Sequence, residues 1–117
     1  MTNYIKRLSD EPTFKQNGLN GFNYHTSCDK VSISYIDVYK GHEKYCSNIA
    51  SYHIYYVIEG NGTFKIDDNL YEVSQNDIIE IPPNTKFVFK GNMKLLLIMN
   101  PPYSENNNVI GKENDLY

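Results

Sequence analysis

Three histidines and two cysteines are the side chains of this 117-residue sequence with the widest chemical range. Cys28 and Cys46 form neither a CxxC pair nor the spacing of a zinc knuckle, so we expect free thiols, with a disulfide between them as the alternative. Cys46 would be a nucleophile only if a neighbour such as a histidine lowered the pKa of its thiol, and a buried unreactive thiol is the commoner case. His42 follows Gly41 in an expected loop and is predicted to lie at the surface, while no pattern places His25.

His53 lies within residues 49–59, a β-rich stretch. Alternate side chains of a strand share a face, so His53, Tyr55 and Val57 are expected to point the same way. A histidine in this position either exchanges hydrogen bonds or protons with a ligand, or is a core residue with a satisfied partner. The residues alone leave both interpretations open.

Tyrosine is unusually abundant, with 11 in the chain. Tyrosine rings could stack on a sugar, but tyrosine is also a favoured strand residue, and for most of them we prefer this structural role. Tyr55 is the exception, because it shares a predicted face with His53. Glu59 and Glu80 stand near strand ends and are expected to be solvated.

Short strands separated by turns must position these side chains. Strands are expected at residues 31–39, 49–59, 63–67, 70–74, 77–81, 86–90 and 93–99, and turns at 60–62, 68–69, 75–76, 82–84 and 91–92. No stretch has a convincing helical period, so the pattern predicts an all-β sandwich or barrel. Residues 1–18 are expected to form a short helical turn or an extended arm, and the polar tail after Tyr103 to be disordered or loosely packed.

The composition is that of one globular domain, with 40% hydrophobic and 21% charged residues. The net charge of -3 argues against a nucleic-acid partner. The first ten residues are polar and no apolar run could span a bilayer, so we expect no secretory leader, no membrane association and a cytosolic location.

Two segments resemble the sequence motifs of the cupin superfamily. Residues 55–64 (YYVIEGNGTF) are similar to its YVLEGxGxF stretch, and residues 76–85 (NDIIEIPPNT) to its GDxxxIPxGxxH motif. The resemblance, which covers residues 31–102, implies a cupin-type double-stranded β-helix, a jelly-roll barrel of two antiparallel sheets. A single domain then has an N-terminal arm with the first strand or strands at 1–30, a barrel core at 31–102 and a polar tail at 103–117. Cupins commonly pair through their N-terminal strands, so a homodimer is expected.

The metal ligands that this resemblance implies are mostly missing. Cupin sites take two His and one Glu from the first motif and one His from the second. The Glu position falls on His53, and the last His position on Phe87. The other two His positions fall, in the two possible registers, on Ser47 and Ile49 or on Cys46 and Asn48. We therefore expect no metal and no other cofactor, with a Cys46/His53 site completed by Glu43 or Asn48 as the alternative.

The pocket expected in such a barrel is lined by His53, Tyr55, Phe87, Cys46 and Asn48. Three functions are compatible with it. The first is binding of a small molecule, of sugar type for example, without a metal. The second is a metal-independent isomerase, epimerase or lyase that uses His53 as acid or base. The third is a metal-dependent enzyme with a rearranged ligand set, because one fold hosts many unrelated activities.

Overall fold

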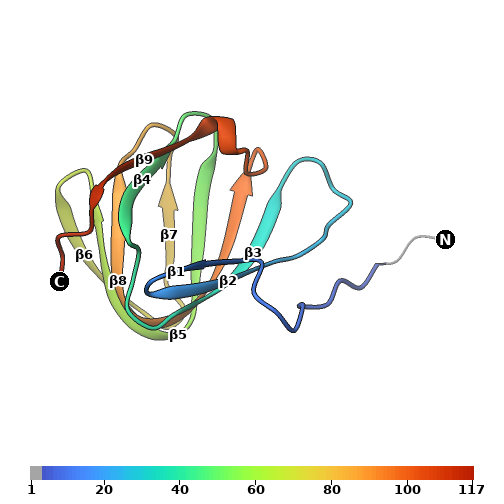
Figure 1. The fold of residues 1–117 in the computed structure, drawn as a ribbon, viewed down its shortest axis with the longest axis horizontal. Helices are drawn as coiled ribbons and strands as arrows, with labels where there is room; N and C mark the ends of the chain where they lie inside the picture. Colours follow the sequence, from blue (N-terminus) through green and yellow to red (C-terminus); the bar gives the residue numbers. More distant parts are fainter. Residues whose placement is uncertain (1–3) are drawn as a thin grey trace.

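The protein is a nearly all-β barrel, described here over residues 4–117 of a computed structural model (Figure 1). Its strands are β1 (Phe14–Gln16), β2 (Leu19–Asn23), β3 (Ser32–Val38), β4 (Lys44–Asn48), β5 (Tyr52–Ile66), β6 (Asn69–Ser74), β7 (Ile78–Ile81), β8 (Phe87–Asn100) and β9 (Asn108–Glu113). The helical content of residues 4–117 is one short 3-10 turn, η1 (Glu105–Asn107). No helix within these residues is long and apolar enough to cross a membrane.

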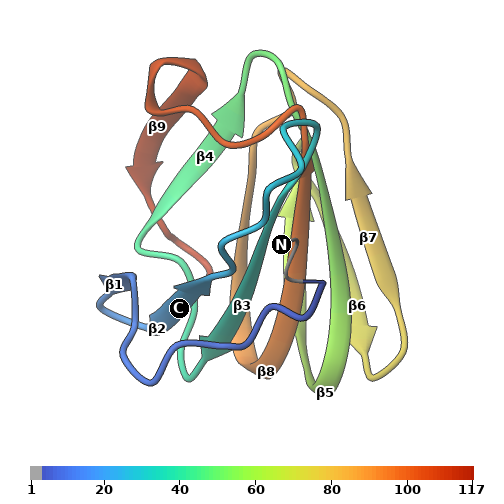
Figure 2. The ribbon, with the colours of Figure 1, turned by 90° about the vertical axis from the view of Figure 1, so that its right-hand side faces the viewer.

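Strands β5 and β8 form the spine of the barrel. They pair antiparallel along almost their whole length, from Tyr52 opposite Asn100 to Ile66 opposite Phe87. The other edge of β5 pairs with β6 and β7, and β8 also pairs with β3 and, at Phe87, with β4. The sheet curls on itself, so that β4 and β9 face β5 and β8 across the interior (Figures 1 and 2). The predicted all-β antiparallel barrel is confirmed.

Two of the predicted turns are wrong, because residues 60–62 and 91–92 lie inside β5 and β8. Gly62 pairs with Gly91, and the ladder continues on both sides of this pair. A Cβ on Gly91 would lie 2.6 Å from the carbonyl oxygen of Asn61, and the residue has a φ of +148°. These glycines therefore mark a close approach of two bending strands, and not a reversal of the chain.

Gly91→Ala is expected to destabilise the barrel by roughly 1–3 kcal/mol, because alanine meets both a backbone clash and an unfavourable φ. Urea unfolding followed by circular dichroism measures this loss. Gly111→Ala is the matched control, since a Cβ there comes closest to the Tyr45 Cβ, at 3.2 Å, and stays at ordinary contact distance, 3.6 Å, from the nearest backbone atom. Equal losses in the two variants would contradict the close-approach explanation.

Other turn signals were interpreted correctly. The hairpin between β5 and β6 turns at Asp67 and Asp68, with φ of +46° and +69°, one residue before the expected position. Asn76 adopts the left-handed conformation, with φ of +77°, and β7 ends at Ile81, directly before Pro82. These turns fix how far β5, β6 and β7 extend.

The tail was predicted to be disordered or loosely packed, and this prediction is wrong. Residues Asn108–Glu113 form β9, which pairs antiparallel with β4, including Cys46 opposite Ile110. Strand β4 was also missed, since no strand was expected between residues 39 and 49. Strand β4 (KYCSN) is mostly polar in sequence and β9 is mostly exposed, so neither shows the apolar alternation by which a strand is recognised.

Aromatic rings fill the barrel between β5 and β8. Tyr55 packs edge-on against Phe64, Phe87 and Phe89 at centroid distances of 5.4, 6.0 and 5.7 Å. All four side chains are at most 2% exposed. We call this cluster of Tyr55, Phe64, Phe87 and Phe89 the aromatic floor, because the polar groups of the interior lie against it.

Candidate functional site

A cavity of about 710 Å³ opens beside this aromatic floor. Strands β1–β5, β8 and β9 all contribute to its walls. Apolar walls come from residues such as Leu19, Ile36 and Leu97, and polar groups from several strands join them. The volume lies within the range of roughly 300–1,000 Å³ that is typical of small-molecule sites.

His42 lies in the wall of this cavity, although the sequence led us to expect it at the surface. The side chain is only 7% exposed. Its ring stacks on Phe89, with centroids 3.8 Å apart, and also contacts Phe87 at 5.6 Å. The loop between β3 and β4 folds inward because Gly41 forms a bridge to Lys90 on β8. The signal that was missed is this glycine directly before the histidine, since its φ of +152° allows the close approach.

His53 and Tyr55 also line the cavity, and the prediction that they share the interior face of their strand with Val57 is confirmed. Their rings are nearly parallel, at 6.1 Å and an interplanar angle of 12°. His53 meets Phe87 edge-on at 4.9 Å. Two imidazoles thus lie against the aromatic floor, of which Tyr55 is itself a part.

These groups are uncharged at neutral pH. Burial lowers the pKa of His42 to about 3, with a smaller contribution from the nearby His53, and burial lowers the pKa of His53 to about 4. Burial raises the pKa of Tyr55 well above its usual 10 and that of the Cys46 thiol to about 12. Cys46 lines the cavity, but such a thiol is not a nucleophile. The buried Nδ1 of His42 has no hydrogen-bond partner among residues 4–117.

The other two predicted pocket residues lie outside the cavity wall. Phe87 is fully buried because both imidazoles cover its ring. Asn48 is 1% exposed, and its Oδ1 accepts hydrogen bonds from the backbone N–H groups of Ala50 and Ser51, at 2.9 and 2.8 Å. Asn48 therefore shapes the turn after β4, while its buried Nδ2 has no hydrogen-bond partner among residues 4–117. Both cysteines, Cys28 and Cys46, are free thiols.

The donor set does not fit a metal ion. Within residues 4–117, no three His, Cys, Asp or Glu side chains converge as metal ligands. The ring of Phe87 contacts both imidazoles, and the Cys46 thiol holds its proton. Glu43, which the alternative site requires, is exposed and accepts a hydrogen bond from the backbone N–H of Asn17 at 2.6 Å.

Comparisons with known proteins agree with this architecture. Residues 44–89 match the family of AraC-like ligand binding domains. An uncharacterized protein of Methanocaldococcus jannaschii is 42% identical over 55 residues, a match that spans 44% of this chain and 44% of that protein. The curated relative is thus matched over less than half of its length.

Solved structures match nearly the whole chain. Pac13, described as a nucleoside dehydratase, superposes with a TM-score of 0.89 at 24% identity, over 96% of this chain and 93% of Pac13. A Streptomyces PAC13 variant with uridine gives 0.90 at 26% identity, over 97% and 93%. KdgF from Halomonas gives 0.69 at 12% identity, over 86% and 89%. The chain has the cupin fold, as its sequence motifs predicted.

Proposed function

We propose that the protein binds a small uncharged molecule of nucleoside type in its cavity, without a metal ion. The observation that carries this proposal is the buried, uncharged polar group formed by His42, His53 and Tyr55. Neutral imidazoles each offer one donor and one acceptor, and the phenol offers both. A ligand with hydroxyl and carbonyl groups on a ring satisfies such partners.

The absence of charge on these groups favours an uncharged ligand. A charged group that leaves water is costly unless an opposite charge meets it, and the imidazoles provide none at neutral pH. The charged side chains of the lining, Glu43 and Lys44, are exposed and stay in water. The aromatic floor suits a flat ring. Uridine is the natural probe, because it is present in a Streptomyces PAC13 structure that shares this fold.

A second candidate function is the removal of water from such a ligand. It is favoured by the imidazole of His42 in the cavity wall and by the nucleoside dehydratase activity for which Pac13 is named. His42 would accept a proton from carbon, the electron pair would form a C=C bond, and the neighbouring hydroxyl would leave as water with the proton that His42 had accepted. His42 would then take the role that the sequence assigned to His53.

The pKa of His42 nevertheless favours binding as the primary function. A general base works best when its pKa is near the working pH, and a histidine with a pKa of about 3 is a weak base. Its strength as a hydrogen-bond acceptor is retained. We therefore place ligand binding first and dehydration second.

Isothermal titration calorimetry with uridine tests the binding proposal. We expect one site per chain, unchanged affinity after treatment with EDTA, and binding of uridine 5′-phosphate at least tenfold weaker. Incubation of uridine with the protein, followed by mass spectrometry for loss of 18 Da, tests dehydration. Failure of uridine to bind at millimolar concentration, or loss of binding with EDTA, would contradict the proposal.

We also propose that the protein is cytosolic and forms a homodimer, as expected from the sequence. Free thiols at Cys28 and Cys46 support the reducing compartment. On the outer face of the barrel, Tyr35 and Tyr56 both lie opposite Leu96 in neighbouring strands. This row of apolar side chains supports a second copy of the chain as partner.

A further inference from the structure

We propose that the last four residues of the chain, 114–117, form a strap that positions His42 for ligand binding. This C-terminal strap follows β9 and lies against the loop that carries His42. The inference rests on the proposed binding function, but it concerns the geometry of His42 in the free protein. Asn114 and Tyr117 are thus positioning residues, which act on the ligand through His42.

The strap holds the backbone of His42 directly. The Nδ2 of Asn114 donates hydrogen bonds to the carbonyl oxygens of His42 and Phe89, at 2.9 and 3.0 Å. The hydroxyl of Tyr117 donates to the same His42 oxygen at 3.2 Å. The N–H of His42 also donates to the Phe89 oxygen, at 3.1 Å. Both carbonyl oxygens therefore accept two bonds, which matches their two lone pairs.

These bonds matter because His42 lies between β3 and β4, outside both strands. A loop residue lacks the ladder that holds a strand residue such as His53. Asn114 reinforces the single bond from the His42 N–H to the Phe89 oxygen, since its amide joins the carbonyl oxygens of both residues. The same backbone carries Phe89, on which the imidazole stacks at 3.8 Å. Ring and backbone of His42 are thereby fixed to one strand.

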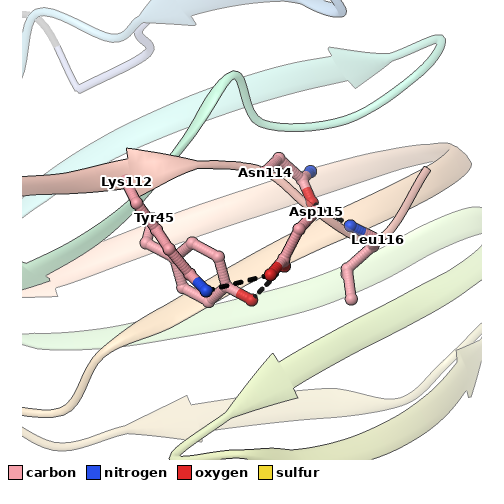
Figure 3. Close-up of polar contacts among 5 residues, drawn as sticks. All are labelled: Tyr45, Lys112, Asn114, Asp115 and Leu116. Atoms are coloured by element: carbon pink, nitrogen blue, oxygen red, sulfur yellow. Dashed lines mark hydrogen bonds and ion pairs between the residues drawn. The ribbon is translucent and has the colours of Figure 1, made fainter.

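The strap is itself anchored at several points (Figure 3). The Tyr45 hydroxyl and the Lys112 ammonium both bond the carboxylate of Asp115, the latter at 3.0 Å. The N–H of Leu116 donates to Oδ1 of Asn114 at 2.9 Å, which orients the amide that reaches His42. The Leu116 oxygen accepts from Lys90 at 2.9 Å. A strap anchored on β4, β8 and β9 can hold His42 in place.

NMR of the free protein tests the strap through the His42 ring. Stacking on Phe89 shifts the imidazole C–H protons upfield by ring current. In the double variant Asn114→Ala/Tyr117→Phe, we expect at least half of this shift to be lost and the lines to broaden. The uridine dissociation constant should rise about tenfold. The milder variant Tyr117→Phe, which removes a single bond, should move both readouts in the same direction and serves if the double variant does not fold.

The matched control is Asn69→Ala/Tyr56→Phe, which removes one asparagine and one tyrosine hydrogen bond at exposed positions away from the strap. It should leave the His42 signals and the uridine affinity unchanged. A folded strap variant with wild-type His42 signals would overturn the inference. If the wild-type protein does not bind uridine, the proposed function fails, while the His42 signals still decide the role of the strap.

Discussion

Replacing His42 with phenylalanine is expected to weaken uridine binding by about 10- to 100-fold while the barrel stays folded. Loss of a buried hydrogen-bond partner costs roughly 1–3 kcal/mol, which corresponds to that range. Phenylalanine is close in size to histidine and can stack on Phe89 in the same way, so the packing survives. Calorimetric titration with uridine measures the affinity, and the thermal midpoint reports the fold.

The matched control for this variant is His25→Phe. His25 also borders the cavity, but it is exposed and outside the aromatic floor, so its loss should cost less than about threefold in affinity. Wild-type affinity in the His42 variant would show that the buried imidazole does not contact the ligand. Equal losses in both variants would point to a general change of the cavity.

Acid is expected to destabilise the protein well above the pH at which carboxylates titrate. The pKa of His42 is about 3 and that of His53 about 4 in the folded state, against 6.5 in the unfolded chain. Below pH 6.5 the unfolded state therefore binds two protons that the folded state does not, and stability falls as pH falls. Each histidine contributes a slope of up to about 1.4 kcal/mol per pH unit.

Urea midpoints measured at pH 7, 6, 5 and 4.5 test this expectation. The window lies above the range of Asp115, whose hydrogen bonds with Tyr45 and Lys112 lower its carboxyl pKa to about 2, so that its own loss of stability comes at lower pH. His53→Phe should reduce the slope by about half, because one of the two buried histidines, His42, remains. A stability that is flat between pH 6.5 and 4.5 would mean that the imidazoles are not desolvated.

The barrel and half of the site could be predicted from sequence because their signals are local. The turns at Asn76 and Pro82 specify short-range geometry. Strand alternation places His53 and Tyr55 on one face, and the resemblance to cupin motifs identifies that face as the interior one. Local patterns of this kind need no knowledge of the distant pairing partner.

The rest of the site depends on pairings that no local pattern encodes. Strands β4 and β9 are partners across about sixty residues of sequence, and their exposed faces hide the alternation. His42 was missed for the same reason, because its burial follows from contacts with β8 and with the C-terminal strap. Gly60 and Gly91 do mark unusual backbone geometry. Glycine is favoured both where a chain reverses and where two strands come close, so its presence alone does not distinguish the two.

The pairing of β5 with β8 has a kinetic consequence. Its two ends, Ile66–Phe87 and Tyr52–Asn100, are separated in sequence by 21 and 48 residues. Loop closure is cheaper at the nearer end, so we expect pairing to nucleate there and to propagate toward Tyr52, enclosing β6 and β7 on the way. Folding of such a nonlocal topology belongs to the millisecond-to-second regime, and the wall that carries His53 is then among the last parts of the spine to form.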